Sequence, residues 1–182
     1  MNQTKALKAS VSNEDLGEVE AVFSTLDVVD KDGDITPASA FRDGQRVKIS
    51  AYNHSIWDGA MPVGVGTIHV DGNEAILKGR FFMSTTGGRE TFEVVKALGE
   101  SQEWSYGFEV MDSEKDTKDG KPVRILKDLN VFEVSPVFIG AGVNTHTRSA
   151  KSADEGDSDD TSTPDLSQEI AREYARFLRN SL

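Results

Sequence analysis

The sequence contains no cysteine. This absence excludes disulfide bonds, thiolate zinc sites and cysteine-protease chemistry together, and it is typical of a reducing compartment. No apolar run approaches the length of a membrane-spanning helix, and the first residues, MNQTKALKAS, lack the apolar core of a signal peptide. We therefore expect a soluble, intracellular protein.

Clusters of basic residues are also missing from the sequence. The chain carries 20 Lys and Arg against 31 Asp and Glu, which gives a formal net charge of −11. A surface for nucleic acid or for an anionic membrane needs concentrated positive charge. We therefore expect no nucleic acid and no membrane among the partners.

Alternation of apolar and polar residues dominates the middle of the chain and indicates β-strands. The sequence EAILKGRFFM follows PVGVGTIHV after Asp71-Gly72-Asn73, which is a hairpin signal. A polar loop is expected over residues 113–122. The strands are expected over residues 18–26, 46–55, 62–70, 74–83, 104–111 and 124–138.

Two helices are expected in the same region. A short one begins after Thr36, its N-cap, with Pro37 in the first turn, and closes at Gly44. A longer one lies within residues 89–101 and is terminated by Gly99, with an apolar stripe and with cap candidates in the preceding Ser-Thr-Thr. The predicted fold is mainly β with a few helices (α+β), with an antiparallel, barrel-like sheet.

The composition changes beyond Arg148. Residues 149–164 hold five carboxylates and no large apolar side chain, so they are predicted to form an acidic disordered linker. Residues 165–182 carry an apolar stripe and are predicted to form an amphipathic helix. The predicted organisation is a flexible tail over residues 1–17, one domain over 18–148, the linker and the helix.

The run Asp30-Lys31-Asp32-Gly33-Asp34 is similar to part of a calcium-binding EF-hand loop. Aligned on Gly33, the loop needs an oxygen ligand at position 28 and an acidic residue at position 39, where the sequence has Val28 and Ser39. A tight turn is the favoured interpretation. A calcium-dependent binding module stays as a weak alternative function.

The stretch QEWSYGF, residues 102–108, places large aromatic side chains at every second position. The opposite face then carries Ser105 followed by Gly107, a small hydroxyl beside a residue without a side chain. A solvent-facing strand more usually carries Thr, Lys or Arg at such positions. Ser105 is either a small filler residue or a nucleophile.

Three histidines are candidate bases for such a serine. His146 lies in the polar run NTHTRS and is interpreted as a solvated loop residue, and His69 is interpreted as a surface histidine on a strand. His54 ends an expected strand and faces the same way as Tyr52. A single histidine is weak evidence of function by itself.

A serine nucleophile also benefits from a third group that orients its base. In VFEVSPVF, residues 131–138, Phe132, Val134 and Phe138 are expected on one face of a strand, whereas Glu133 and Ser135 project from the other. A carboxylate at Glu133 is either exposed on a polar face or buried beside a cationic partner. The residues alone leave both possibilities open.

The order of four blocks, DVVDKDGDITPASAF, YNHS with PVGVGTI after it, WSYGF and FEVSPVFIGAGVNT, resembles the prohead proteases of tailed bacteriophages. These are serine endopeptidases related in fold to herpesvirus assemblin, and the resemblance covers Val19 to Thr145. It implies an assemblin-like fold, with the base at His54, the nucleophile at Ser105 and an acid at Glu133. Ser135, two residues further on, is an alternative support for His54.

The resemblance also implies a role. The substrates would be the scaffolding segment of the major capsid protein and the protease itself, cleaved inside the immature procapsid in the host cytoplasm, with no cofactor and no metal. Gly107 would leave space for the substrate chain, self-association as a homo-oligomer is expected, and the tail would be a docking element or a self-cleavage site. The alternative is a capsid-assembly or scaffold-binding module of the same fold with little activity.

Overall fold

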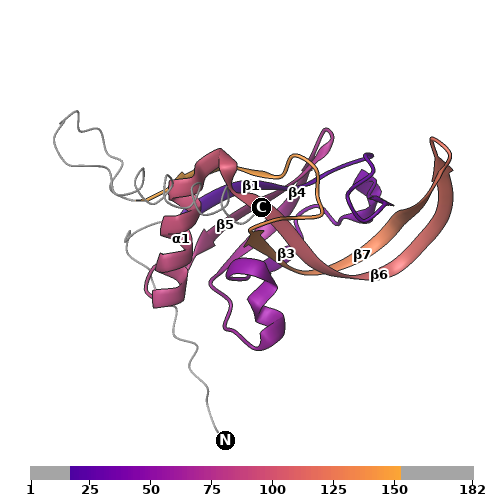
Figure 1. Cartoon of the computed structure of the whole chain (residues 1–182). Coiled ribbons are helices and arrows are strands. Elements are labelled where there is room, and N and C mark those ends of the chain that lie inside the picture. The colour runs from indigo at the N-terminus through magenta and orange to yellow at the C-terminus, as the bar shows by residue number, and fades with distance from the viewer. Residues whose placement is uncertain (1–16, 153–182) are drawn as a thin grey trace, which may run out of the picture.

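The structure, a computed structural model, describes residues 17–152. One curled sheet forms the body of the molecule (Figure 1). Its strands are β1 (Glu18–Thr25), β2 (Asp34–Ile35), β3 (Arg46–Ile49), β4 (Gly64–Asp71), β5 (Glu74–Phe81), β6 (Glu103–Lys118), β7 (Lys121–Val137) and β8 (His146–Lys151).

The strand order is β2-β7-β3-β4-β5-β1-β8, with β6 paired to β7. Most neighbours are antiparallel, whereas β2 and β3 each run parallel to β7. The curl brings β8 back towards β6, where Trp104 Nε1 donates a hydrogen bond to Thr147 Oγ1 at 2.9 Å. This half-closed sheet confirms the predicted mainly β, barrel-like fold.

The inside of the curl forms the apolar core. Phe23 is fully buried there and makes edge-to-face contacts with Phe41 and Tyr106, at ring-centroid distances of 5.5 and 5.3 Å. Trp104 and Leu129 are also fully buried. The aromatic face of the strand that carries Ser105 therefore anchors it in the core, as the alternating pattern predicts.

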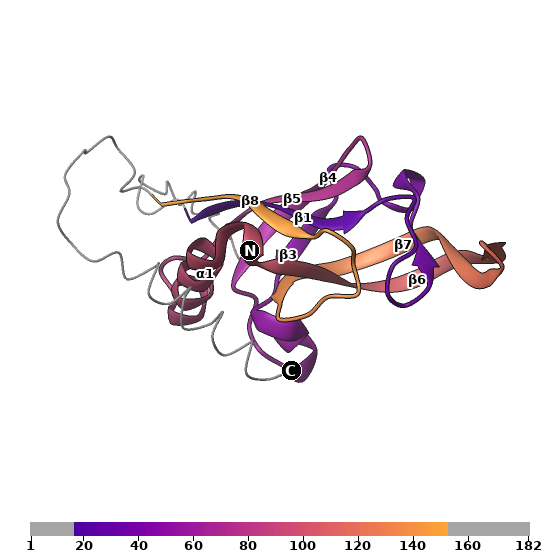
Figure 2. The same ribbon diagram turned by 45° about the horizontal axis from the view of Figure 1, so that its top comes forward.

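The helix α1 (Thr86–Leu98) packs at one end of the sheet, with Phe92 against Phe81 (Figure 2). Its N-cap is Thr85, whose hydroxyl accepts a hydrogen bond from Gly88 N at 3.0 Å, and Gly99 follows its last residue with a φ of 53°. Both signals match the prediction from the sequence, although the helix begins three residues earlier than expected. None of the helices in the described part of the chain is long and apolar enough to cross a membrane.

The region expected to be a polar loop is instead the far end of a long hairpin. Strands β6 and β7 pair up to Lys118 and Lys121, around a turn at Asp119 and Gly120 with φ values of 52° and 75°. The hairpin extends beyond the rest of the sheet in both views (Figures 1 and 2). Residues 113–118 of β6 are exposed on both faces, so the sequence shows no apolar alternation there.

Two further expectations at the edges of elements are wrong. The helix after Pro37 is one 3-10 turn, η1 (Ala38–Ala40), and the Thr36 hydroxyl lies 3.4 Å from Tyr106 Oη instead of capping it. Residues 149–151, expected to begin the linker, belong to β8 and pair with β1. The remaining linker, the C-terminal helix and residues 1–16 lie outside the described residues.

The acidic run near Asp30 forms a tight turn, as favoured from the sequence. Asp30 Oδ1 accepts hydrogen bonds from the backbone N–H groups of Asp32 and Asp34 at 2.9 and 2.8 Å. Asp34 in turn accepts two hydrogen bonds from the Arg124 guanidinium, at 2.9 and 2.6 Å. The carboxylates are thus used within the fold, and no cluster of His, Asp and Glu in residues 17–152 could hold a metal ion.

Candidate active site

The candidate site is built on the paired strands β6 and β7. Ser105 lies directly opposite Ser135, and Gly107 directly opposite Glu133. Partners in a ladder project to the same face of a sheet, about 5 Å apart for antiparallel neighbours. The register therefore gathers Ser105, Gly107, Glu133 and Ser135 on one face, opposite the aromatic core.

A β-bulge adjoins this group. Gly107 pairs with Glu133 but the next residue, Phe108, pairs with Val131, so Phe132 is an extra residue without a partner on β6. Phe132 is consequently exposed and packs edge-to-face against Trp57, with ring centroids 5.6 Å apart. The expectation that Phe132 shares the face of Val134 is wrong because simple alternation does not anticipate a bulge.

His54 reaches the site from a short helical segment and not from a strand. Strand β3 ends at Ile49, and η2 (Tyr52–Asp58) follows it. Asn53 and His54 have φ values of 55° and 59°, in the left-handed region that costs a non-glycine residue about 1–2 kcal/mol. The predicted strand over 46–55 is therefore wrong in its second half, and two left-handed residues in succession turn the His54 side chain towards β7.

The His54 ring contacts both candidates for the supporting residue. Its Nδ1 lies 2.6 Å from Glu133 Oε1 and 3.1 Å from Ser135 Oγ. A carboxylate only accepts hydrogen bonds, so this contact places the ring proton on Nδ1 and leaves the lone pair on Nε2. Glu133 is thus the nearer partner, and Ser135 lies beside it at the same nitrogen.

Glu133 is fully buried although it carries a carboxylate. Its Oε2 has no hydrogen-bond partner among the described residues, and Oε1 contacts the half-buried His54 ring. Burying a carboxyl group with a single partner costs several kcal/mol and stabilises a fold poorly. Such a residue fits a role in the chemistry of a site better than a structural role.

Ser105 lies one strand away from these contacts. It is half-buried and sits opposite Ser135, whose hydroxyl touches the ring. Among the described residues no hydrogen bond joins the Ser105 hydroxyl to His54. This does not count against Ser105, because catalytic hydrogen bonds are often loose until a substrate is bound. Ser105 also borders a cavity of about 140 Å³ between the acidic turn and residues 141–143.

Gly107 is needed for the histidine–glutamate contact itself. A Cβ at this position would overlap Glu133 Oε1 and lie 2.8 Å from Trp57 Nε1. The space over Gly107 is therefore filled by the glutamate carboxylate and the Trp57 indole. The expectation that Gly107 leaves room for a substrate chain is wrong, because its missing side chain makes room for Glu133.

Side-chain hydrogen bonds hold η2 in place, among them that from Tyr52 Oη to Gln102 Oε1 at 2.7 Å. Asn53 Oδ1 accepts a hydrogen bond from the backbone N–H of Phe138 at 3.2 Å, which ties the segment to the end of β7. Ser50 Oγ accepts one from Ile56 N at 3.1 Å. The role of Asn53 was not apparent from the sequence, although Asn beside a candidate histidine is compatible with a left-handed backbone.

Exposed apolar side chains lie in or just after the two segments that carry the site, η2 and the end of β7. Trp57 is 59% exposed, and Met61, Phe138 and Ile139 are also exposed. A large exposed aromatic next to a polar centre is characteristic of recognition surfaces. Trp57 is the residue in this group that contacts the site directly, since its indole lies over Gly107.

The other two histidines are not part of this arrangement. His69 Nε2 lies 2.9 Å from Thr67 Oγ1 on β4, as expected for a surface histidine with a local partner. His146 begins β8, and its Nδ1 lies 2.9 Å from Asn144 O, so its interpretation as a loop residue is wrong. Neither is within the group formed by His54, Glu133 and Ser135.

Residues 39–159 match the family described as caudovirus prohead serine protease. The chain belongs to this family. The matched region covers well over half of the 182 residues and includes His54, Ser105 and Glu133. No curated protein and no solved structure gives a significant match.

Membership of the prohead protease family confirms the resemblance drawn from the four sequence blocks. It supports a protease of capsid maturation as the general function, together with association with capsid proteins and action in the procapsid.

Proposed function

We propose that this chain is a serine endopeptidase in which Ser105 is the nucleophile, His54 the general base and Glu133 the residue that orients His54. The observation that carries the proposal is the 2.6 Å contact between His54 Nδ1 and the buried Glu133 carboxylate. This contact leaves Nε2 as the proton acceptor, and the register of β6 on β7 supports Ser105 as the hydroxyl beside it.

In the first half of the reaction, Ser105 Oγ attacks the scissile carbonyl carbon and its proton passes to His54 Nε2. Glu133 stabilises the imidazolium that forms. His54 then donates the proton to the leaving amine, which departs and leaves an acyl-enzyme. In the second half a water molecule gives a proton to His54 and attacks the ester carbonyl carbon. His54 then returns the proton to Ser105 Oγ as the ester bond breaks, which releases the acid and the free serine.

Two serines on the same face compete for the role of nucleophile. Ser135 is fully buried, and its hydroxyl lies at Nδ1, the nitrogen that Glu133 also contacts. A hydroxyl at that nitrogen cannot lose its proton to a lone pair on Nε2. Ser105 is half-buried and therefore more accessible to a peptide, which favours it over Ser135.

We infer that the substrates are the scaffolding segment of the major capsid protein and the protease itself, cleaved inside the procapsid. Membership of the prohead protease family supports this assignment. The second candidate is an assembly module of the same fold that binds capsid partners and cleaves poorly. The exposed Trp57, whose indole lies over Gly107, is compatible with either role.

The test is to express the chain with capsid protein that carries its scaffolding segment, and to follow cleavage by mass spectrometry. Ser105→Ala should abolish cleavage and labelling by a fluorophosphonate, whereas Ser135→Ala, a matched loss of one hydroxyl, should retain part of both. Processing by Ser105→Ala at the wild-type rate would refute the mechanism. A wild-type chain that binds capsid protein without cleavage or labelling would favour the assembly module.

A further inference from the structure

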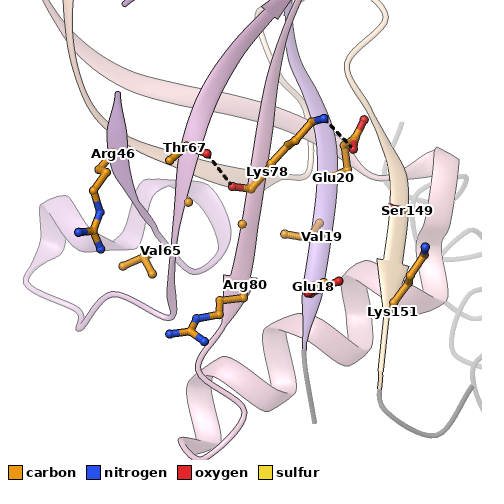
Figure 3. A pocket seen from close by; sticks show the side chains of 12 residues that line it. Glu18, Val19, Glu20, Arg46, Val65, Thr67, Lys78, Arg80, Ser149 and Lys151 are labelled. Atoms are coloured by element: carbon orange, nitrogen blue, oxygen red, sulfur yellow. Dashed lines mark hydrogen bonds and ion pairs between the residues drawn. The ribbon is translucent and has the colours of Figure 1, made fainter. Parts of the chain in front are cut away.

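A shallow groove of about 550 Å³ crosses the outer face of the sheet, away from the aromatic core. It spans β3, β4, β5, β1 and β8 (Figure 3). Four basic side chains border it, one from each of β3 and β8 and two from β5: Arg46, Lys151, Lys78 and Arg80. The groove thus gathers cations from distant parts of a chain whose net charge is −11.

Strand register explains why these side chains share one face. Residues that pair across a sheet project together, and so do residues two positions apart on one strand. Two neighbouring rows of partners therefore line the groove. The first row is Arg46, Thr67, Lys78, Glu20 and Ser149, and the second is Val65, Arg80, Glu18 and Lys151.

The positive charge of the groove is only partly balanced. Glu20 lies 3.7 Å from Lys78 and 3.0 Å from Arg148, so one carboxylate serves two cations. Among the described residues, Arg46, Arg80 and Lys151 are in no ion pair.

We propose that the acidic segment of the same chain, residues 154–160, binds in this groove. The segment, DEGDSDD, carries five carboxylates, and it begins three residues after Lys151 at the groove's edge. Its charge is complementary to that of the groove. The proposal concerns binding of this segment and does not depend on the proposed proteolysis.

The length of the segment fits the width of the groove. Four steps between neighbouring strands separate β8 from β3, which is about 19 Å at about 4.8 Å per step. Nine residues from Lys151 to Asp160 reach about 30 Å when extended, at about 3.3 Å per residue. The carboxylates can therefore reach Lys78, Arg80 and Arg46 in turn. In Figure 3, Arg46 lies at one edge of the groove and Lys151 at the other.

Attachment to β8 makes such binding favourable even if each contact is weak. A short connection holds the segment at an effective concentration of about millimolar or above. The contacts are between exposed charges, so salt must weaken them. The segment would approach β3, whose Lys48 pairs with Glu133 of the candidate site on β7. It would therefore occupy the face of the sheet that adjoins the site.

The test uses the full chain with the substitution Ser105→Ala. If the wild-type chain cleaves itself, this substitution prevents the cleavage and keeps residues 154–160 attached. A carbodiimide joins lysine amines directly to carboxylates, and mass spectrometry then locates each link. We expect intramolecular links from Lys78 to residues 154–160, well above those from Lys115 and Lys121, exposed lysines of the β6–β7 hairpin. At about 1 M salt, where the screening length is about 3 Å, the links from Lys78 should be lost.

Two variants make the result specific. The double variant Arg46→Gln with Arg80→Gln keeps Lys78 and should reduce the number of its links several-fold. The control is Arg42→Gln, which removes an exposed arginine that pairs with Asp128 and should leave the links of Lys78 unchanged. Equal linking of Lys78, Lys115 and Lys121 would overturn the proposal. Links found only between isotopically distinct chains would also overturn it, because the occupant would then be a second copy. The links from Lys78 are measured without any cleavage reaction. Absence of protease activity therefore does not affect the test of the groove.

Discussion

His54 Nδ1 lies 2.6 Å from Glu133 Oε1, although 79 positions separate the two residues in the sequence. The contact depends on three local features: a pair of left-handed residues in η2, the bulge at Phe132 and the missing side chain of Gly107. Each feature can be altered separately.

Glu133→Gln should lower cleavage by about a hundred-fold or more with little change in melting temperature. The amide has the shape of the carboxyl group, but it can donate as well as accept, so the ring can take the wrong tautomer and the imidazolium loses its counter-charge. Ser135→Ala should cost far less. The measurement is kcat/KM beside the thermal unfolding curve, and a Glu133→Gln variant as active as wild type would exclude the orienting role.

Gly107→Ala should reduce activity strongly because the new methyl group displaces the Glu133 carboxylate and the Trp57 indole. A shift in tryptophan fluorescence should accompany the loss. Gly87→Ala in α1 is the matched control, since its Cβ meets only Val63 Cγ1 at 3.5 Å and alanine favours a helix by about 1 kcal/mol. If the two variants behave alike, Gly107 is not needed for the contact.

Asn53→Ala should lower both stability, by about 1–2 kcal/mol, and activity. It removes the acceptor for Phe138 N and puts alanine at a φ of 55°. Asn53→Gly separates the two effects, because glycine tolerates the backbone but still lacks the amide. Activity of Asn53→Gly equal to wild type would show that the side chain does not position His54. Chemical denaturation and kcat/KM together give the answer.

Burial raises the pKa of Tyr106 above its ordinary value of 10.0. The neutral phenol is thus favoured in the folded state, and this contribution to stability is complete below about pH 10 and lost as the pH rises through the folded-state pKa. The free energy of unfolding should fall more steeply above pH 10 in wild type than in Tyr106→Phe. Absorbance at the phenolate band should show one tyrosine that ionises above pH 10 in wild type and none in Tyr106→Phe. If the wild-type titration shows no tyrosine that ionises later than those of the variant, the prediction is wrong.

Several parts of the fold follow from the sequence by itself because the signals are local. The hairpin at Gly72, the capped helix that Gly99 ends and the aromatic face opposite Ser105 each depend on neighbouring residues and on the period of one element. The order of four sequence blocks was enough to indicate the family. Local residues also predicted that the acidic run at Asp30 forms a tight turn.

Only the tertiary structure decided which residues meet. Simple alternation could not anticipate the bulge at Phe132 or the left-handed turn at His54, because a bulge depends on the partner strand and a strained φ depends on the surroundings that enforce it. The basic groove shows the same limit. Its cations are dispersed in a strongly acidic sequence, and strand register alone brings Arg46, Arg80 and Lys151 to one face.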